Sequence, residues 1–495
     1  MVRRSTDAVV IGSGPNGLAA AVTLARAGLE VTVFEAEETV GGGARTLDLG
    51  LAPGVVHDIC SAVHPLALAS PFFAEFDLAA RGVDLRVPEV AYAQPMPDGP
   101  AGIAYRSLGR TAAELGPDGA AWFDLFGPLV ENAAVLTELA LGNRRSLPSG
   151  LLTPGGLRAA IGAAARLLEQ GTRAWSARFR GDVAPALFTG VAAHSISTQP
   201  SLAGAGTAIM LATHAHAAGW PIPVGGSGAI IGALRADLEA HGGRIQTGHR
   251  VRTWRELPRA RAYLFDTTPA TLLGIWGERI PERVRAALAR FRYGDAAAKV
   301  DYVLSDAVPW ADPRVGEAST VHVGGTREEM AYAESLVAEG AHAATPMVLF
   351  SDPSVADPGR IVAGLRPGWA YAHVPAGSTV DVTEAVTAQI ERFAPGFRDV
   401  VVSSRCVPAA DMAEHNQNYV GGDIAAGAVS TWGMAARPRL STDPFAAGIP
   451  GVYLCSASVP PGPGVHGMGG HHAARRALAQ RFKVPPPSLA PRSTV

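Results

Sequence analysis

The sequence predicts an α/β fold, made of a Rossmann-type nucleotide-binding domain assembled from discontinuous segments and an inserted α+β domain. Three observations predict it. A strand pattern at residues 7–11 runs through a glycine-rich turn into a helix pattern. Strand and helix patterns of the same kind return near residues 220–268 and 451–482. With 495 residues, the chain is too long for one simple core.

The first element is a strand, a tight turn and a helix. The turn, residues 12–17, has the spacing G-x-G-x-x-G. Gly12 permits the sharp turn, Gly14 leaves room for a pyrophosphate against the backbone, and Gly17 lets the helix pack closely on the strands. The predicted dinucleotide-binding residues of this turn are Gly12, Gly14, Pro15, Asn16 and Gly17.

A second strand pattern covers residues 30–34 and ends at Glu35, 18 positions after Gly17. In a dinucleotide-binding unit, a carboxylate at this spacing accepts hydrogen bonds from a ribose diol. Glu35 and its neighbour Ala36 are therefore candidate cofactor-binding residues.

A second glycine cluster, residues 41–46, resembles the G-G-x-x-x-R-T element of the amine oxidase and phytoene desaturase group of flavoproteins. The resemblance implies that FAD is the cofactor and that the nucleotide domain is of the glutathione-reductase-like type. It also implies that the cluster covers the FAD diphosphate, with the arginine close to it. The candidate residues are Gly42, Gly43, Arg45 and Thr46.

The second segment of the nucleotide domain begins near residue 220. A glycine turn at 225–228 precedes an apolar-periodic helix at 229–241, which Gly242 and Gly243 end. Strands are predicted at 244–247 and 263–269. In the flavoprotein group the same order includes a valine whose backbone meets the adenine, which makes Val251 the candidate here.

The third segment is a strand at 451–458, a Gly/Pro loop at 460–470 and a helix at 473–482. Such a turn presents backbone N–H groups to an anion or a polar ring edge. The resemblance implies that this element closes over the flavin ring, with Ser458, Gly467 and Met468 as contacts. An ordinary strand-to-helix turn is the alternative.

These segments divide the chain into two domains and a tail. The FAD-binding domain is predicted at 1–75, 215–295 and 405–482, the substrate domain at 76–214 and 296–404, and a Pro-rich disordered tail at 483–495.

Composition excludes several classes of protein. The net charge of −2 creates no field that would draw nucleic acid. Cys60, Cys406 and Cys455 form no C-x-x-C pair, which argues against a disulfide reductase and suits a reducing cytoplasm. The N-terminus leads directly into the first strand, and no window of about 18 apolar residues occurs, so we expect neither a signal peptide nor a membrane span.

Taken together, the motifs resemble a phytoene-desaturase-type FAD-dependent oxidoreductase, nearest to the branch labelled pyridine nucleotide-disulfide oxidoreductase domain-containing protein 2. The resemblance implies hydride transfer between flavin N5 and a lipophilic unsaturated substrate, such as a carotenoid, another isoprenoid or another polyene. Desaturation, saturation and isomerisation all stay open. Because no second G-x-G-x-x-G unit follows, oxygen or a quinone is the expected electron acceptor.

Two other functions are kept as alternatives. A flavin amine oxidase would need aromatic rings to enclose the amine, and Trp432, Tyr419 and Tyr453 are the aromatics that sequence position favours. A non-catalytic, FAD-bound, membrane-associated scaffold is the other.

Three residues are candidate catalytic groups. Lys299, one of two lysines in the chain, lies in a strand pattern at 296–304, and the resemblance implies that a lysine there holds a water beside flavin N5. A surface pair with Asp301 is the alternative. His64 and His466 could act as proton donors near neutral pH, or simply hold loops in place. The adjacent His471 and His472 lack spaced carboxylates or cysteines, so no metal site is predicted.

Two further patterns concern the surroundings of the site. Residues 414–424 resemble the "H-N-x-N … G-G-D" loop of the group, which implies a loop that supports the pocket or the FAD. Arg158, Arg166 and Arg173 are spaced so that they can share one helix side. That side could dock on anionic lipid, or it could be a solvated helix face. We therefore expect a cytoplasmic protein and leave a peripheral membrane contact open.

Overall fold

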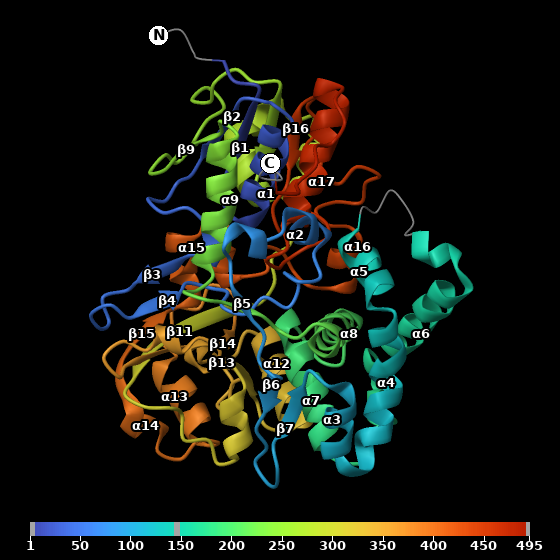
Figure 1. Cartoon of the computed structure of the whole chain (residues 1–495), viewed down its shortest axis with the longest axis vertical. Coiled ribbons are helices and arrows are strands. Elements are labelled where there is room, and N and C mark those ends of the chain that lie inside the picture. The colour runs from blue at the N-terminus through green and yellow to red at the C-terminus, as the bar shows by residue number, and fades with distance from the viewer. Residues whose placement is uncertain (1–4, 143–148, 492–495) are drawn as a thin grey trace.

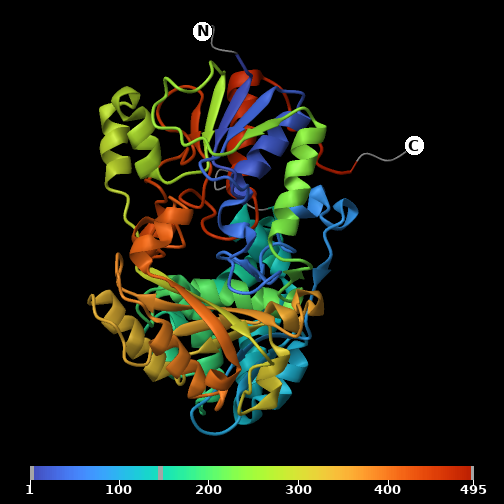
Figure 2. The ribbon, with the colours of Figure 1, turned by 90° about the vertical axis from the view of Figure 1, so that its left-hand side faces the viewer.

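The computed structural model describes residues 5–142 and 149–491. Figures 1 and 2 show one lobe built around a sheet of chain segments from both ends and the middle of the sequence, and a second lobe that holds a larger sheet and most of the remaining helices. The two lobes are joined by several chain crossings, so each contains residues far apart in sequence.

The first lobe is a five-stranded parallel sheet in the order β16-β10-β1-β2-β9. Short apolar runs such as Ala8–Ile11 and Val31–Phe34 form its centre and are buried along their whole length, as parallel strands covered on both faces require. The strands are β1 (Ala8–Ile11), β2 (Val31–Phe34), β9 (Arg244–Gln246), β10 (Ala262–Phe265) and β16 (Val452–Leu454). The helices around this sheet include α1 (Pro15–Arg26), α9 (Gly228–Ala240) and α17 (Met468–Ala477).

The second lobe contains a seven-stranded mixed sheet in the order β15-β11-β14-β13-β12-β6-β7. Its pairs are antiparallel except for β12 with β6. The strands are β6 (Val90–Gln94), β7 (Gly102–Tyr105), β11 (Ala296–Leu304), β12 (Thr320–Val323), β13 (Val348–Ser351), β14 (Arg366–Val374) and β15 (Val401–Val407). Two-stranded pairs add β3 (Thr46–Asp48) with β4 (Val56–Asp58), and β5 (Leu85–Arg86) with β8 (Ile222–Pro223).

Alternation along this sheet separates its two faces. Val300, Phe350 and Ala370 point to one face and belong to a hydrophobic core there. Trp369 and Tyr371 point to the other face and pack with Ala62 and Ile196. The second face is the one that meets the segments coming from the parallel sheet.

Helices complete both lobes. In the first lobe and the connections these are α2 (Pro71–Phe76), α10 (Pro269–Trp276), α11 (Glu282–Ala289), α15 (Met412–His415) and α16 (Thr431–Ala435). In the second lobe they are α3 (Leu108–Glu114), α4 (Gly119–Glu131), α5 (Ala133–Leu141), α6 (Pro154–Gln170), α7 (Val183–Ala192), α8 (Leu202–Ala217), α12 (Arg327–Ala338), α13 (Thr383–Glu391) and α14 (Phe397–Val400). The predicted α/β fold with an inserted α+β domain is confirmed.

Local predictions near the C-terminus need correction. Helix α17 begins at Met468, five residues before the predicted start, because the glycines at 469 and 470 are helical. Strand β15 continues to Val407 in the seven-stranded sheet, past the predicted domain boundary at 405. The described part of the predicted disordered tail packs against the first lobe: Leu489 is buried, and its N–H donates to Glu75 Oε1 at 2.9 Å.

Candidate functional site

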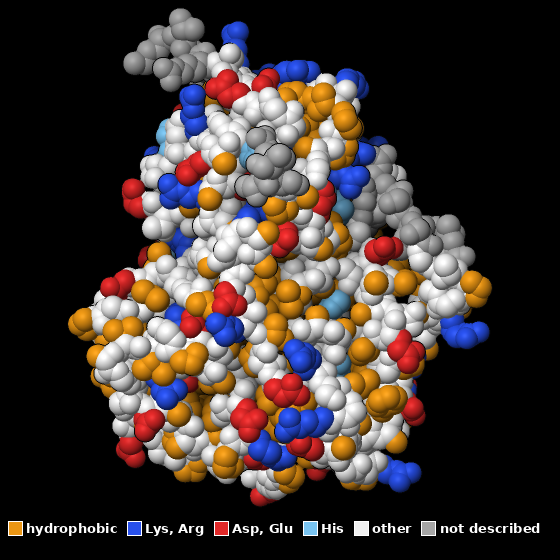
Figure 3. All heavy atoms as spheres, viewed as in Figure 1, with side chains coloured by type: hydrophobic (Ala, Val, Ile, Leu, Met, Phe, Trp, Pro, Cys, Tyr) orange, Lys and Arg blue, Asp and Glu red, His pale blue; other side chains and the backbone are white. Residues whose placement is uncertain are grey.

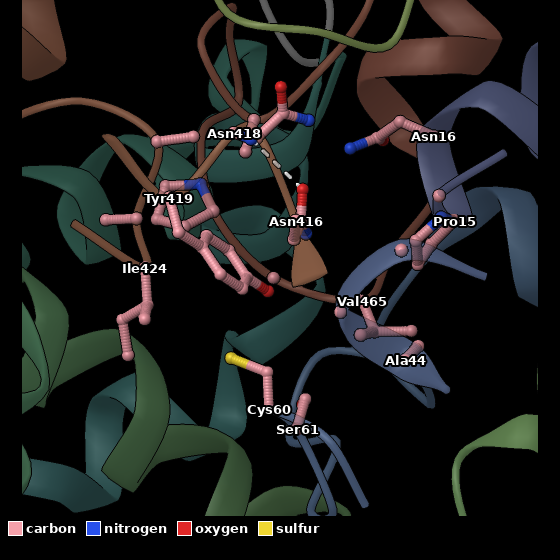
Figure 4. Close-up of a pocket in the computed structure, with 18 of the residues that line it drawn as sticks. Pro15, Asn16, Ala44, Cys60, Ser61, Asn416, Asn418, Tyr419, Ile424 and Val465 are labelled. Carbon is pink, nitrogen blue, oxygen red and sulfur yellow. Dashed lines mark hydrogen bonds between the residues drawn. The ribbon is translucent and has the colours of Figure 1, made fainter. Parts of the chain in front are cut away.

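The carboxyl ends of the parallel strands open onto a cavity of about 820 Å³. Ile11 is in register with Phe34 and Phe265, so the next residues, Gly12, Glu35 and Asp266, meet at one edge of the sheet. Ligands of open α/β sheets bind at this edge. Figure 4 shows part of the cavity: Pro15, Asn16 and Ala44 lie on one side of it, Asn416, Asn418 and Tyr419 on another, and Cys60 and Ser61 between.

The glycines of the first turn are required by close contacts. Gly12 has φ +93°, and a Cβ on it would lie 2.7 Å from the Asp266 carbonyl oxygen. A Cβ on Gly17 would lie 2.2 Å from the Gly12 carbonyl oxygen, so this glycine allows the predicted close packing. A Cβ on Gly14 would lie 2.6 Å from Asp266 Oδ2. The space beside Gly14 is therefore taken up by a carboxyl group of the protein.

The predicted turn residues do not all border the cavity. Gly12, Gly14, Pro15 and Asn16 do. Gly17 does not: its N–H donates to Asp266 Oδ2 at 2.8 Å.

The predicted ribose-binding acid borders the cavity and is held firmly. Glu35 Oε2 accepts from Ser13 N at 2.9 Å and from the Ser13 hydroxyl, and Oε1 accepts from Glu37 N at 3.0 Å. A carboxylate offers about four acceptor positions, so capacity for a diol remains. Ala36 and Val251 also border the cavity at this end.

The second glycine cluster brings Gly42 and Gly43 to the cavity. A Cβ on Gly42 would lie 3.1 Å from Gly14 Cα, and one on Gly43 would lie 2.0 Å from the Tyr419 hydroxyl. Glycine is therefore needed at both positions because the two glycine segments and the Tyr419 loop approach one another closely.

Arg45 and Thr46, also predicted to bind the cofactor, do not border the cavity. Arg45 is buried, and its guanidinium donates to the carbonyl oxygens of Gly42, at 2.8 Å, and His415. Thr46 Oγ1 donates to Asp58 Oδ1 at 2.6 Å and accepts from Gly228 N at 2.9 Å. Both side chains hold the loops that border the cavity in place.

The loop at 414–424 resembles a pocket-supporting segment, and the structure places it at the cavity. Asn416, Asn418, Tyr419 and Ile424 border it. Asn418 Oδ1 accepts from Thr268 N at 2.9 Å and its amide donates to the Asp266 carbonyl oxygen at 3.0 Å, which ties the loop to the end of β10.

The C-terminal loop also borders the cavity, but through residues other than those predicted. Pro461, Pro463, Gly464 and Val465 line it. Ser458 instead donates to the Ala426 carbonyl oxygen at 2.7 Å. Gly467 approaches Phe72 and Ala19, where a Cβ would lie 2.8 Å from the Phe72 ring, and Met468 is the first residue of α17. Gly467 and Met468 therefore form the start of α17, and none of the three predicted residues borders the cavity.

The predicted catalytic lysine lies behind the cavity wall. Lys299 is buried, forms an ion pair with Asp301, and lies 5.9 Å from the centre of the Trp369 ring. The alternative of a pair with Asp301 is therefore what the structure contains, although the pair is buried instead of exposed. Trp369, and not Lys299, borders the cavity.

The two predicted histidines differ in position. His64 borders the cavity, and its Nε2 lies 2.8 Å from Ser227 Oγ. Burial lowers the pKa of His64 to about 4, so its ring is neutral at pH 7. His466 does not border the cavity: its Nδ1 accepts from Met468 N at 3.1 Å at the start of α17, and burial lowers its pKa to about 4. Neither ring is a cationic acid near neutral pH.

Sequence reasoning missed Asp266 as a site residue. Its position directly after β10, level with Gly12 and Glu35, was the available signal. Burial, opposed by hydrogen bonds from Gly17 N and Gly14 N and assisted by the charge of Glu35, raises the pKa of the Asp266 carboxyl to about 7.

Sequence reasoning also missed the apolar half of the cavity, which the second lobe supplies. Its lining includes one side of α8 and the cavity-facing side of the large sheet. The residues are Leu202, Ala203, Gly206, Thr207, Met210 and Leu211 from α8, and Thr320, Leu349, Trp369 and Tyr371 from the sheet. The α8 positions recur every four residues, a helical period that could have been read from the sequence.

The residues that line the cavity fit a flavin dinucleotide. Glycine turns and the carboxylate of Glu35 lie at one end of the cavity, and an apolar chamber at the other. Within the described residues, no three or more His, Cys, Asp or Glu side chains form a cluster suited to a metal ion. The described helices include none long and apolar enough to cross a bilayer.

Comparison with known proteins agrees with these features. Residues 10–76 match the family described as NAD(P)-binding Rossmann-like domain. An uncharacterized protein of Mycobacterium bovis is 28% identical over 560 residues, covering 96% of this chain and 97% of that protein. Pyridine nucleotide-disulfide oxidoreductase domain-containing protein 2 of Rattus norvegicus is 25% identical over 551 residues, covering 94% and 92%. Hydroxyneurosporene desaturase of Cereibacter sphaeroides is 41% identical over 76 residues, 15% of this chain and 14% of that one.

Among solved structures, wild-type putrescine oxidase bound to putrescine superposes with a TM-score of 0.58 and 17% identity, covering 97% of this chain and 100% of that one. At this identity the likeness concerns the fold, and it matches the parallel sheet plus mixed sheet seen here. The predicted resemblance to FAD/NAD(P)-binding Rossmann-like oxidoreductases is confirmed.

The raised pKa of Asp266 predicts a pH-dependent stability. A carboxyl group whose pKa is higher in the folded than in the unfolded chain stabilises the folded state. This stabilisation is complete below the pKa of the group in the unfolded chain, near 4, and is lost as the pH rises to about 7. The loss amounts to roughly 4 kcal/mol for a shift of about three units. Asp266→Asn should remove it, because the amide has no charge to desolvate.

We therefore expect the melting temperature of Asp266→Asn to exceed that of the parent protein at pH 8, with the difference shrinking toward pH 4. Differential scanning fluorimetry across this range measures it. Asp98→Asn, at an exposed carboxyl, is the control for the charge change. A difference in melting temperature between Asp266→Asn and the parent protein that stays constant from pH 4 to pH 8 would contradict the prediction.

Proposed function

We propose that this flavin-type oxidoreductase, of the amine oxidase and carotenoid desaturase superfamily, uses FAD to transfer hydride to or from a lipophilic unsaturated substrate. Carotenoids, other isoprenoids and other polyenes are the substrate class. The observation that carries the proposal is the cavity itself: one space borders both the dinucleotide turns and the apolar chamber. A substrate in the chamber would therefore share the cavity with the cofactor.

The chemistry of the chamber favours an apolar substrate. Three acidic residues occur among the described residues that line the cavity, namely Glu35, Glu37 and Asp266. All three lie at the cofactor end. The walls of the other end are mostly aliphatic and aromatic, so they exclude water and favour a chain of similar character. Of the three aromatics predicted to enclose an amine, Tyr419 borders the cavity, whereas Trp432 is 69% exposed on α16 and the Tyr453 hydroxyl donates to Gln480 in the first lobe.

The roles of the chain's own residues follow from their positions. Gly12, Gly14, Asn16 and Gly43 would hold the diphosphate side of FAD, and Glu35 its ribose. Bound FAD supplies the hydride acceptor or donor, so few acid–base groups are needed. Neutral His64 holds the Ser227 turn, and the Lys299–Asp301 pair supports the Trp369 wall.

Oxygen or a quinone is part of the proposal as electron acceptor. The described residues form one parallel Rossmann sheet, and its strand ends lead to the cavity described above. A second nucleotide domain, which NADPH would need, has no counterpart among the described sheets. An isomerase would need no acceptor.

The test is an anaerobic visible spectrum of the purified protein with a liposome-borne polyene, and with a panel of amines in parallel. A desaturase should show bleaching of the flavin band by the polyene. Oxidation of dithionite-reduced flavin by the polyene would identify a saturase, and polyene isomerisation at constant flavin absorbance an isomerase. Bleaching by amines alone, a flavin inert to every addition, or the absence of a flavin band would overturn the proposal.

We also propose that the protein contacts membranes peripherally, through α6. Leu157, Ile161 and Leu168 are 54%, 62% and 57% exposed, and their spacing puts them on one side of the helix. The helix lies at the outer edge of the second lobe, where hydrophobic side chains are visible (Figures 1 and 3). It packs on α8, and Leu167 of α6 itself borders the cavity.

The arginines predicted to face lipid are only partly available. Arg166 donates to the carbonyl oxygens of Asp124, at 2.7 Å, and Leu125, at 2.8 Å, so it binds α4 and not lipid. Arg158 is exposed on α6, whereas Arg173 is exposed in the 3-10 turn Arg173–Ser176 beyond the end of the helix, so the three arginines do not share one side of one helix. The exposed leucines and isoleucine therefore carry more of the proposed contact than the arginines do.

Replacing Leu157, Ile161 and Leu168 by serine should weaken binding to anionic liposomes by about tenfold or more, because the apolar contribution to insertion is lost. Co-sedimentation of the full chain measures it. Val402→Ser, at a 55% exposed position of β15, is the control and should bind as the parent protein does. Equal sedimentation of the triple variant would refute the contact through α6.

A further inference from the structure

A carboxyl group of the protein lies at the glycine turn that begins α1. Asp266 Oδ2 accepts from Gly17 N at 2.8 Å, and a Cβ on Gly14 would lie 2.6 Å from the same oxygen. Gly14 and Asp266 both border the cavity. Backbone N–H groups at the start of a helix are the donors that bind phosphate in dinucleotide sites. One of these donors is therefore already bound to an acid of the protein.

The side chain of Asp266 is enclosed by protein but remains in contact with the cavity. The residue is 7% exposed. Among the described residues, no donor forms a hydrogen bond to Oδ1, and Oδ1 is not one of the fully enclosed polar atoms that lack a partner. Oδ1 therefore keeps accessible surface, and the cavity is the space that this residue borders.

The groups around Asp266 disfavour its charged form. Glu35, which borders the same end of the cavity, acts on it as a like charge. The Cys455 thiol of β16 is neutral, because burial raises its pKa well above the usual value. Asn418, from the loop at 414–424, donates to the Asp266 carbonyl oxygen and carries no charge. No cation of the described chain lowers the pKa of Asp266, which is about 7.

A bound diphosphate would add negative charge to this group of acids. A like charge within a few ångströms favours the neutral form of a carboxyl group. The neutral form also has an O–H donor, which the ionised form lacks. A neutral Asp266 can therefore add a hydrogen-bond donor to a diphosphate site in which an ionised Asp266 would repel the ligand.

We infer that Asp266 binds the cofactor diphosphate as a neutral carboxylic acid, whose O–H donates a hydrogen bond to a phosphate oxygen. The inference rests on the proposed function, because it concerns the proposed FAD site. Cofactor binding then includes the uptake of one proton wherever the free protein holds Asp266 ionised.

The sign of the pH dependence follows from this proton. In the free protein the pKa of Asp266 is about 7, and the bound diphosphate raises it further. Affinity for FAD is therefore highest below pH 7, where Asp266 is already neutral, and falls as the pH rises above 7.

The test is equilibrium dialysis of the purified full chain against FAD, from pH 5.5 to pH 8.5 at constant ionic strength. The diphosphate and the flavin ring of oxidised FAD keep their charge in this range, so the slope of log Kd against pH counts the protons that the protein takes up. The slope should be near zero at pH 5.5 and close to one at pH 8. The dissociation constant should rise about tenfold or more between pH 6.5 and pH 8.5.

Variants assign the proton to Asp266. Asp266→Asn keeps an acceptor for Gly17 N and offers an N–H donor to phosphate, so its dissociation constant should change less than about threefold over the same range. Asp98→Asn, at an exposed carboxyl, is the matched control and should keep the rise of the parent protein. His249→Gln, at another titratable residue that borders the cavity, should also keep the slope.

The outcomes separate this inference from the proposed function. A dissociation constant independent of pH in the parent protein, or a rise that persists in Asp266→Asn, overturns the role of Asp266 and leaves the FAD site standing. NAD⁺, which also carries an adenosine diphosphate group, is dialysed in parallel. If NAD⁺ binds with a slope that Asp266→Asn removes and FAD binds at no pH, the role of Asp266 is supported and FAD is refuted as cofactor. If neither binds at any pH, both proposals fail.

Discussion

The parallel register of β1 with β2 and β10 is the constraint on which the site depends. It brings Gly12, Glu35 and Asp266 to one edge of the sheet, although Asp266 lies more than 200 residues from the other two in sequence. Space at this edge is so limited that glycine is required at 12, 14 and 17. The same crowding buries the Asp266 carboxyl and raises its pKa to about 7.

The second sheet completes the cavity because loops from the first lobe are anchored to it. His57 Nε2 lies 2.9 Å from the Tyr302 carbonyl oxygen of β11, and Asp58 forms a buried ion pair with Arg360 at 3.0 Å. These contacts hold the segment that continues to Cys60 and His64 between the two sheets. The aromatic face of β14 then forms the far wall, so one space extends from nucleotide turn to apolar chamber.

Local motifs made the nucleotide end predictable from the sequence. The glycine spacing and Glu35 lie within one contiguous βαβ unit, and β11 has the predicted bounds, Ala296–Leu304. The sequence does not show which side chains face the cavity. Arg45 and His466 have the right chemistry, but their partners, a carbonyl of His415 and Met468 N, come from tertiary packing or from a helix start that glycines obscured. The pairing of Lys299 with Asp301 was an alternative that the sequence offered, but the burial of that pair was not predicted. Trp369 and the α8 residues carry no motif.

The central claim is that FAD and the substrate chamber share one cavity. A crystal structure of the protein purified with its own cofactor tests it most directly. The account predicts density for FAD with the diphosphate against residues 12–16 and 42–43 and the flavin ring at the boundary of the chamber formed by α8 and β14. Density for a nicotinamide dinucleotide in that position, or side chains that close the passage between the two halves, would contradict it.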